Sequence, residues 1–269
     1  MLDRWRQPRS VPMKTTGNTI LITGGGSGIG EALAQRFHDA GNTVIVAGRR
    51  LDALEAACAG RENMHAIRLD VESAEGVAAF AAEVLERFPA LNVLVNNAGI
   101  MRYERLDRAR DLSDAEATIT TNLLGPIRLI DALVDHLVAR GDGTIVDVTS
   151  GLAFVPLPGT PTYNATKAAI HSYTMSLREM LRDKVEVIEL APPAVQTDLT
   201  PGQSTREGYQ PLGEFADEVM ALFAQQPTPE EVLVERVKPL RFAEVQGTIA
   251  QVMAHMSAMT RKMFEQLGL

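Results

Sequence analysis

Short apolar runs alternate along the chain with longer segments in which apolar residues recur every three or four positions. The apolar runs predict strands over residues 19–22, 43–47, 64–69, 92–96, 144–148 and 185–190. The amphipathic segments predict helices over residues 31–40, 51–59, 73–88, 113–139 and 162–183. Such alternation is typical of a parallel sheet covered by helices on both faces. Right-handed crossovers then favour a Rossmann-type, doubly wound α/β domain with a ligand crevice at the carboxyl ends of its strands.

The pattern changes after Leu190. An irregular segment rich in proline, glycine and polar residues follows, and helices are predicted over residues 212–225, 230–237 and 242–259. Long irregular loops beside the crevice of a compact domain are usually functional. Within a single domain of residues 14–269 we therefore expect a substrate loop or lid at about 194–226 and a helical tail at about 229–263. Residues 1–13 are polar and broken by two prolines, which predicts a flexible extension.

Composition narrows the possible partners. The chain has 269 residues, of which 45% are hydrophobic and 22% charged, and its formal charge is −8. This charge leaves no basic face for nucleic acid or an anionic membrane. No apolar run approaches the ~18 residues of a membrane helix, and the N-terminus lacks the apolar core of a secretory signal. We expect a cytoplasmic protein that binds neither nucleic acid nor membrane. We expect no metal site either, and we interpret the single cysteine, Cys58, as a small buried apolar residue.

A glycine-rich turn, Thr23-Gly-Gly-Gly-Ser-Gly-Ile-Gly30, follows the first predicted strand and opens a helix. Strand, glycine turn and helix in this order direct backbone N–H groups and a helix N-terminus at a pyrophosphate. The spacing is T-G-x-x-x-G-x-G, with Gly24, Gly28 and Gly30 in the fixed places, rather than the common G-x-G-x-x-G. A glycine turn without a ligand is the alternative, because glycine is also the default residue of tight turns.

Tyr163 and Lys167 stand four residues apart on a predicted helix, so their side chains share one face. A nearby cation lowers the pKa of a phenol from about 10, which suits Tyr163 to exchange a proton with an alcohol or alkoxide. Ser150 ends the fifth predicted strand and can donate a hydrogen bond to a carbonyl oxygen in the same crevice. The alternatives are a solvated surface pair and an ordinary capping serine.

Pro126 lies four residues after Asn122 in a predicted helix. Because proline has no N–H, it leaves the main-chain carbonyl of Asn122 without its helical partner and predicts a kink. The alternative is an asparagine that is merely tolerated beside the kink, since proline kinks need no function.

In combination, these motifs resemble the short-chain dehydrogenase/reductase family over about residues 17–200. The resemblance implies a catalytic tetrad of Asn122, Ser150, Tyr163 and Lys167. Tyr163 would be the acid/base, Lys167 would lower its pKa and hold the nicotinamide ribose, and Ser150 would orient and polarise the carbonyl. The main-chain oxygen of Asn122 would hold a water of the proton relay.

The resemblance also implies a nicotinamide nucleotide. Asp70 matches an aspartate that contacts the adenine, and the segment 96–99 matches an N-N-A-G motif that steadies the sheet and lines the nicotinamide side. The expected cofactor-binding residues are Gly24, Ser27, Gly28, Ile29, Gly30, Arg49, Arg50, Asp70, Val71, Asn97, Ala98, Gly99, Tyr163, Lys167, Pro193, Val195 and Thr197.

The end of the second strand favours NADP(H) over NAD(H). Gly48 stands where NAD-dependent members have an aspartate, so the charge that would repel a 2′-phosphate is missing. Arg49 follows directly and can contact the phosphate with its planar guanidinium, while Ser27 offers a hydroxyl nearby. Arg50 is expected to flank the next helix or to share the phosphate. The alternative is that both arginines are solvated and either nucleotide is accepted.

Two departures from the family pattern bear on assembly. Pro193 stands where many members have glycine, and the tail lacks the glycine-rich final strand through which many members form tetramers. The segment 235–242 instead resembles a bacterial branch of the family, the DltE-like oxidoreductases. We expect a homodimer through helices 113–139 and 162–183, and leave a tetramer open.

The sequence thus predicts an NADP(H)-dependent oxidoreductase. It would transfer a hydride between nicotinamide C4 and a carbonyl or secondary alcohol of a small, partly apolar substrate. The expected pocket wall consists of residues 151–154 and the segment after Thr197. The alternative is a non-catalytic NADP(H)-binding protein, a redox sensor or interaction module on the same fold.

Overall fold

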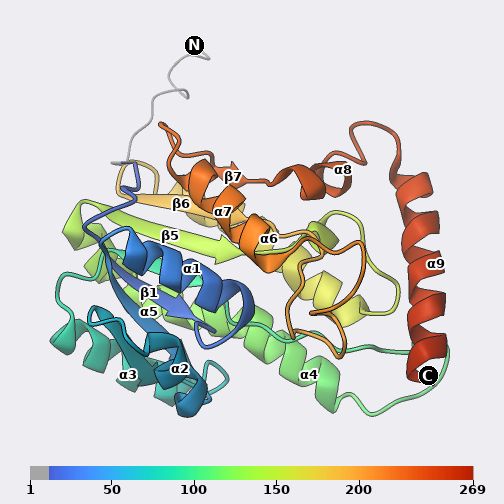
Figure 1. The fold of residues 1–269 in the computed structure, drawn as a ribbon, viewed down its shortest axis with the longest axis horizontal. Helices are drawn as coiled ribbons and strands as arrows, with labels where there is room; N and C mark the ends of the chain where they lie inside the picture. Colours follow the sequence, from blue (N-terminus) through green and yellow to red (C-terminus); the bar gives the residue numbers. More distant parts are fainter. Residues whose placement is uncertain (1–11, 269) are drawn as a thin grey trace.

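A seven-stranded parallel sheet forms the centre of the protein in a computed structural model, which describes residues 12–268 (Figure 1). The strand order is β3-β2-β1-β4-β5-β6-β7. The strands are β1 Thr19–Thr23, β2 Thr43–Gly48, β3 Met64–Arg68, β4 Val93–Asn96, β5 Gly143–Val148, β6 Val185–Leu190 and β7 Glu231–Val232. The order reverses between β1 and β4, which confirms the predicted doubly wound sheet and places a crevice at the carboxyl ends of these strands.

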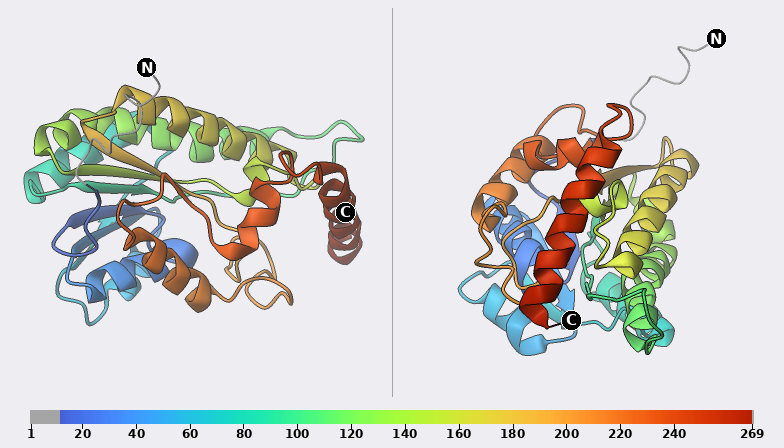
Figure 2. Two further views of the ribbon diagram at one scale, coloured as in Figure 1. Left: turned by 90° about the horizontal axis from the view of Figure 1, so that it is seen from above. Right: turned by 90° about the vertical axis from the view of Figure 1, so that its right-hand side faces the viewer.

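Helices cover both faces of the sheet (Figure 2). The helices are α1 Gly28–Asp39, α2 Leu51–Cys58, α3 Ala74–Arg87, α4 Ser113–Ile119, α5 Gly125–Arg140, α6 Pro161–Met180, α7 Leu212–Phe223, α8 Lys238–Arg241 and α9 Ile249–Leu267. A π-helical turn, Thr120–Leu124, joins α4 to α5, so the helix predicted over residues 113–139 is present with one irregular turn. Short 3₁₀ turns occur at Gly151–Ala153 and Glu235–Val237.

The hydrophobic core consists of two clusters, one on each face of the sheet, because side chains along a strand point alternately to the two faces. Ile20 and Ile22 face a cluster with α1 and α7, whereas Leu21 faces a second cluster with α3 and α5. Successive side chains of a strand point to opposite faces, so a run that is apolar at every position is buried on both sides. This explains why β1, β2 and β4 could be recognised as continuous apolar runs.

The C-terminal third differs from the prediction. The helix predicted over residues 230–237 is wrong, because Glu231–Val232 pairs in parallel with β6 as the edge strand β7. Val232 and Val234 are both fully buried, which is the alternation of a strand. The last helix begins at Ile249 rather than at residue 242, after a turn in which Gly247 adopts a positive φ of 68°. It stands at one end of the domain (Figure 2).

The segment between β6 and α7 is closed at its base. The N–H of Gln196 donates to Gln210 O at 2.9 Å, and the N–H of Gln210 donates to Ala194 O at 2.9 Å. The predicted substrate loop is therefore a loop with paired ends.

The N-terminal extension predicted over residues 1–13 falls largely outside the described residues. At its end, Met13 is buried, and its N–H donates to Glu186 Oε2 at 2.6 Å. Among the described helices, none has an apolar stretch of the length and hydropathy needed to cross a bilayer.

Candidate active site

Two connected cavities open at the carboxyl ends of β1, β4 and β5. One, of about 330 Å³, lies between the glycine turn and the end of β2, where Arg49 and Arg50 line it. The other, of about 470 Å³, extends from the same turn to Ser150, Tyr163 and Lys167. We call them the arginine end and the tyrosine end. They share lining residues, which are Gly24, Ser27, Arg49, Arg50, Ala98, Gly99 and Ile100.

Most of the predicted site residues line these cavities. They are Gly24, Ser27, Gly28, Ile29, Arg49, Arg50, Val71, Asn97, Ala98, Gly99, Ser150, Tyr163, Lys167, Pro193, Val195 and Thr197. Gly30, Asp70 and Asn122 lie outside this lining. The Asp70 carboxylate accepts the N–H of Glu72 at 3.1 Å, so it caps a turn at the end of β3.

Glycine is required within the turn between β1 and α1. Gly24 and Gly28 have φ of 68° and 56°, in the left-handed region. A Cβ on Gly30 would lie 2.3 Å from Gly24 O, so only glycine lets the start of α1 approach the turn. Gly30 therefore shapes the turn from behind without lining the cavity.

The N-N-A-G segment is fastened to the same turn. The N–H groups of Asn97 and Ala98 both donate to Thr23 Oγ1 at 3.0 Å. Asn97 Nδ2 donates to Thr23 O at 2.9 Å, and Asn96 Nδ2 to Asp147 Oδ1 at 2.9 Å. These bonds hold the loop after β4 against β1 and β5, which forms the floor of the crevice.

Three polar side chains are buried together at the tyrosine end. Ser150, Tyr163 and Lys167 are 7%, 7% and 5% exposed. Ser150 Oγ accepts the N–H of Leu152 at 3.1 Å, and the hydroxyl is near enough to the Tyr163 phenol to affect its pKa. Lys167 Nζ donates to Val148 O at 2.8 Å and lies 5.7 Å from the centroid of the Tyr163 ring. The serine at the end of β5 and the two residues on α6 thus meet as the sequence predicted.

Burial dominates the protonation of this group. It raises the pKa of Tyr163 to about 12, and the neighbouring Ser150 hydroxyl acts in the opposite direction. Burial also lowers the pKa of Lys167 to about 8, against the carboxylate of Asp147. The sequence predicted that Lys167 lowers the pKa of Tyr163, whereas the net shift in the free protein is upward because the phenol is desolvated. At neutral pH the phenol of Tyr163 is therefore protonated.

Asn122 lies in the π-helical turn and is 1% exposed. Its side chain makes two hydrogen bonds to the main chain of Ile100 in the crevice wall. Oδ1 accepts the N–H of Ile100 and Nδ2 donates to Ile100 O, both at 2.8 Å. The irregular turn occurs where Pro126 was predicted to disturb the helix. A role of the side chain in holding the wall was not predicted.

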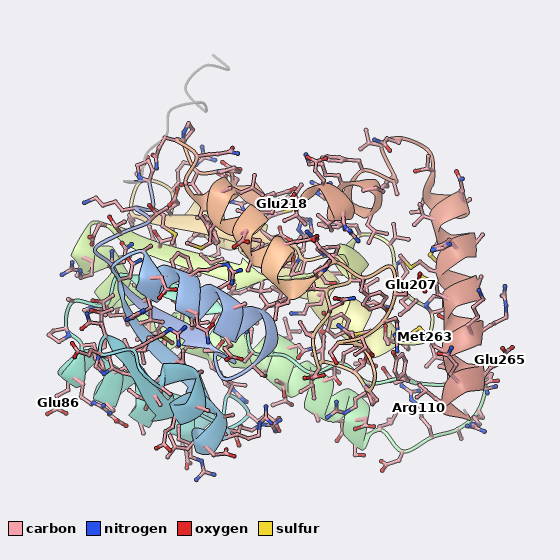
Figure 3. The ribbon with its side chains drawn as sticks, viewed as in Figure 1. Glu86, Arg110, Glu207, Glu218, Met263 and Glu265 are labelled. Carbon is pink, nitrogen blue, oxygen red and sulfur yellow. The ribbon has the colours of Figure 1, made fainter. Side chains whose placement is uncertain are left out.

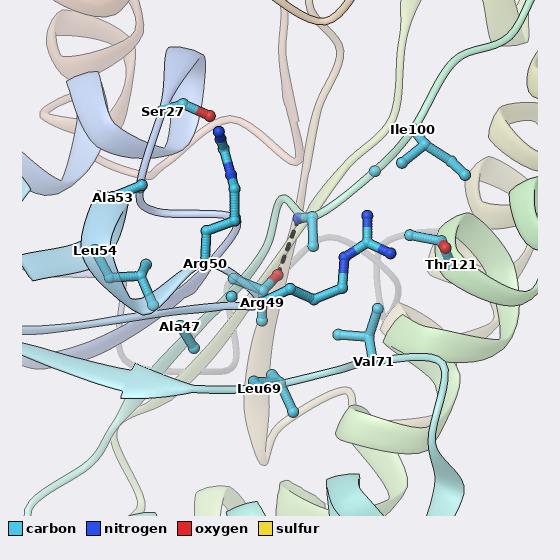
Figure 4. A pocket seen from close by; sticks show the side chains of 16 residues that line it. Ser27, Ala47, Arg49, Arg50, Ala53, Leu54, Leu69, Val71, Ile100 and Thr121 are labelled. Carbon is cyan, nitrogen blue, oxygen red and sulfur yellow. Dashed lines mark hydrogen bonds between the residues drawn. The ribbon is translucent and has the colours of Figure 1, made fainter.

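The two arginines point in different directions (Figure 4). Arg49 lies towards Thr121 and its Nη1 is 3.2 Å from Glu72 Oε1, whereas Arg50 extends towards Ser27. Thr121 Oγ1 also donates to Glu72 Oε1, at 2.7 Å. Arg50 thus stands between the end of β2 and the glycine turn, a place that the sequence assigned chiefly to Arg49.

The expected pocket wall at residues 151–154 is turned away from the cavities. A Cβ on Gly151 would lie 2.6 Å from Leu240 Cδ1, so this turn packs against α8. The Phe154 ring packs on His171, with centroids 5.1 Å apart, and the Arg241 guanidinium lies 4.9 Å from its centroid. The segment after Thr197 does line the tyrosine end, through Asp198, Leu199 and Gln203. The lining residues that the sequence did not single out are Ile100, Arg102, Val148, Thr149 and Pro192.

Behind Phe154, ligand atoms of His171, Glu189 and Glu231 lie within 4.8 Å of one another, which is close enough for a metal ion. His171 Nδ1 contacts Glu189 Oε2 at 2.7 Å, and this contact raises the pKa of His171. Arg241 donates to both oxygens of Glu231, at 2.7 and 2.9 Å. Arg241 therefore supplies the positive charge that this cluster needs.

The donor set of the crevice fits a dinucleotide. The start of α1 presents backbone N–H groups at the glycine turn, two arginines lie at one end, and buried polar side chains lie at the other. The family model for short chain dehydrogenases matches residues 18–208. The protein belongs to the short-chain dehydrogenase family. It is therefore an oxidoreductase, and the predicted family is confirmed.

Relatives of this short-chain dehydrogenase extend over most of the chain. It is 40% identical to an uncharacterized oxidoreductase, DltE, of Bacillus subtilis, over 86% of this chain and 93% of that one. It is 38% identical to a sulfoacetaldehyde reductase of Chromohalobacter salexigens, over 67% of this chain and 74% of the relative. An alcohol dehydrogenase from the archaeon Thermococcus sibiricus, solved with 5-hydroxy-NADP, is 30% identical. It superposes with a TM-score of 0.72, covering 82% of this chain and 97% of that structure.

Proposed function

We propose that the protein is an NADP(H)-dependent reductase or dehydrogenase that interconverts a small carbonyl compound and its alcohol. The observation that carries this proposal is the buried group of Ser150, Tyr163 and Lys167 in a crevice that continues to Arg49 and Arg50. A bound nicotinamide would supply or accept the hydride at C4. The protein has to bind the carbonyl, exclude water from it and deliver the proton.

Tyr163 is the proposed proton donor in the reducing direction. With a pKa of about 12 its phenol is fully protonated at neutral pH, so it can give a proton to oxygen as negative charge grows there. Ser150 stabilises the same oxygen with its hydroxyl. Lys167 carries the positive charge that favours an anionic phenol once the proton has left, and it holds the nicotinamide ribose.

Asn122 and Pro126 complete the proposed proton path. Asn122 lies in an irregular turn of the helix, and Pro126 lacks the N–H that would otherwise bond its carbonyl. We assign this carbonyl to a relay water, while the Asn122 side chain holds Ile100 in the crevice wall.

NADP(H) is the proposed nucleotide because two arginines follow β2 and no aspartate stands at its end to repel a 2′-phosphate. A Cβ on Gly48 would touch only Leu54 Cδ2, at 3.7 Å, so this position leaves room beside the arginines. We propose that Arg49 and Arg50 share the 2′-phosphate, with Ser27 as a further donor. Val71 and Asp70 would lie on the adenine side.

The proposed substrate is small and partly apolar. Ile100, Pro193 and Leu199 supply apolar lining at the tyrosine end, and Arg102 supplies a cation there. One relative is named for an aldehyde that carries a sulfonate, so anionic aldehydes belong in the first panel of substrates.

The proposed assembly is a homodimer through α4, α5 and α6. Large apolar side chains on this side are exposed to solvent in the single chain, namely Ile119, Leu124, Met175 and Met180. Exposed apolar patches of this kind mark interfaces. Sedimentation of the wild-type protein, compared with Met175→Glu, tests this contact.

The function is tested by following NADPH absorbance with ketones, diketones, neutral aldehydes and anionic aldehydes. We expect at least one carbonyl compound to be reduced, and Tyr163→Phe to lower turnover by ~10²–10⁴-fold, the range for a lost general acid. NADPH affinity of this variant should stay within a few-fold of the wild type. Binding of NADPH without turnover of any compound would instead favour a redox-sensing module, and a fully active Tyr163→Phe would remove Tyr163 from the mechanism.

A further inference from the structure

Glu104 is a buried acid in the loop of residues 97–112, between β4 and α4. Its side chain is only 5% exposed. Oε1 accepts the N–H of Thr162 at 3.0 Å, and Oε2 accepts the Thr162 hydroxyl at 2.8 Å. Arg110, from the same loop, donates to Oε2 at 2.6 Å. The carboxylate therefore accepts three hydrogen bonds, and Arg110, one of the three donors, also balances its charge.

The N–H of Thr162, in the first turn of α6, has no acceptor within the helix and needs one from elsewhere. The first helical residue of α6, Pro161, has no N–H, and Thr160 at the N-cap makes no side-chain capping bond. The N–H of Thr162 is thus the first free donor of the helix, and a carboxylate beside it also suits the positive end of the helix dipole. Glu104 supplies from a distant loop the cap that the helix lacks in its own sequence.

The contact joins the two walls of the tyrosine end. The loop that carries Glu104 lines the cavity through Gly99, Ile100 and Arg102, and Thr162 directly precedes Tyr163. A second bond, from the N–H of Glu104 to Gly159 O at 2.9 Å, fixes the loop to the turn before α6. Tyr163 therefore lies on a helical turn that is tied to the opposite wall.

The last helix packs on the same place. The N–H of Gly159 donates to Thr260 Oγ1 at 3.2 Å, and a Cβ on Gly159 would lie 3.2 Å from the Phe264 ring. Thr260 and Met263 are the buried residues of α9, so this helix is anchored at the start of α6. Figure 3 labels Met263 and Arg110 on the side of α9 that faces the domain.

We propose that Glu104 is a positioning residue that sets the place of the Tyr163 phenol through Thr162. Loss of the carboxylate frees the first turn of α6, and a displacement of about 1 Å at a reacting group can slow catalysis by ~10²-fold. Lys167, one turn further on, is held independently by Val148 O. The nucleotide site is fastened through Thr23 and Asn97, so nucleotide binding is insulated from the change.

Substitution of Glu104 separates positioning from general loosening of the fold. Glu104→Ala should lower kcat by ~10–100-fold, while the Kd for NADPH stays within about threefold. Glu104→Gln retains an acceptor for the Thr162 N–H, but it loses the ion pair with Arg110 and replaces Oε2, which accepts the Thr162 hydroxyl, with an amide donor. Its kcat should therefore lie between that of Glu104→Ala and that of the wild type. Asp107→Asn is the matched control, because it disrupts an exposed ion pair with Arg105 in the same loop without touching Thr162.

Three outcomes would overturn the proposal. They are a wild-type kcat in Glu104→Ala, a loss of NADPH affinity as large as the loss of kcat, or a Glu104→Gln variant as slow as Glu104→Ala. If Glu104→Ala does not fold, Thr162→Val replaces it. This variant lacks only the hydroxyl and should lose kcat several-fold with unchanged NADPH affinity, and a wild-type kcat would contradict the inference.

This inference rests on the proposed role of Tyr163, and the two can fail separately. An active Tyr163→Phe would refute the acid/base role whatever Glu104 does. Turnover that depends on Tyr163 but is indifferent to Glu104 would refute the positioning role alone.

Discussion

The arginine end and the tyrosine end of the crevice use opposite means of recognition. At the arginine end, backbone turns and exposed cations line the cavity, and the Arg49 side chain is 55% exposed. At the tyrosine end, Ser150, Tyr163 and Lys167 are almost fully buried, and Lys167 donates to Val148 O of the sheet. Burying polar groups is unfavourable unless each finds a partner. Substitutions at the arginine end should therefore change which nucleotide is bound, whereas those at the tyrosine end should change turnover and pH-dependent stability together.

The largest effect is expected for Lys167→Met, at the tyrosine end, which keeps the length of the side chain and removes its charge. We expect turnover to fall by ~10²-fold or more, because the phenol loses its neighbouring cation and the ribose loses a donor. Initial rates at saturating NADPH measure the effect. A turnover within tenfold of the wild type would show that the charge of Lys167 is not used.

Stability as a function of pH gives the same variant a second readout. The pKa of Lys167 is about 8 in the folded protein against 10.5 for an unperturbed lysine, so between these values the unfolded chain binds the extra proton. Stability that depends on this group is present above about pH 10.5 and is lost as pH falls through about 8. The difference in melting temperature between Lys167→Met and the wild type should therefore shift in favour of the variant as pH falls from 9.5 to 7.5. A constant difference across this window would contradict the lowered pKa.

The arginine end should respond in nucleotide preference instead. Hydrogen bonds to charged groups correspond to about ten- to a hundredfold in affinity, so Arg49→Ala and Arg50→Ala should each lower the ratio of kcat/KM for NADPH over NADH by about tenfold. The double variant should lower it by roughly a hundredfold with little change in melting temperature. A single variant that removes the whole preference would assign the phosphate to one arginine.

Glu72 provides the matched control for this pair. It holds Arg49 at 3.2 Å and is partly exposed. Glu72→Gln removes the negative charge that competes with the phosphate, so the preference for NADPH should stay or rise slightly. A fall in preference would mean that Glu72 serves to orient Arg49.

The difference between the two ends also explains how far the sequence could be interpreted. The glycine turn, the N-N-A-G segment and the Tyr163–Lys167 pair are local patterns, in which spacing along the chain already determines the geometry. The cap on Thr162 is not local, because Glu104 lies 58 residues away. The pairing of Glu72 with Arg49 and the packing of residues 151–154 on α8 likewise depend on tertiary contacts. Spacing along the sequence cannot predict partners of this kind.

The C-terminal third shows the same limit in the fold. The segment 230–237 has helix-forming residues at both ends, and the strand between them is only two residues long. Its identity as β7 comes from pairing with β6 and from burial of Val232 and Val234, which a short window of sequence cannot reveal. The prediction of the site residues depended less on this region, because most of them precede it in the sequence.

Charge loss at the tyrosine end should also appear in the pH profile of reduction. Tyr163, with its pKa raised to about 12, stays protonated across the usual range, whereas Lys167, with its pKa lowered to about 8, loses its charge above that pH. We expect kcat to be level below pH 8 and to fall by up to tenfold per unit above it, as for a single titrating group. Lys167→Arg keeps a charge at every pH used, so any activity that it retains should lack this fall. An unchanged alkaline limb in Lys167→Arg would assign the titration to another group.

The smallest predicted effect concerns the helix that joins the two ends. Thr121, at the arginine end, and Asn122, which holds Ile100 at the tyrosine end, lie in one π-helical turn. Pro126→Ala restores an N–H that can bond the Asn122 carbonyl, which favours a regular helix and withdraws that oxygen from the proposed relay. We expect kcat to fall a few-fold, an altered solvent isotope effect, and a melting temperature equal to or above that of the wild type. Leu123→Ala, in the same turn and partly buried, controls for local loosening. A rate and isotope effect identical to the wild type would mean that proton transfer does not use the Asn122 carbonyl, and that this turn contributes to the tyrosine end only through the Asn122 side chain.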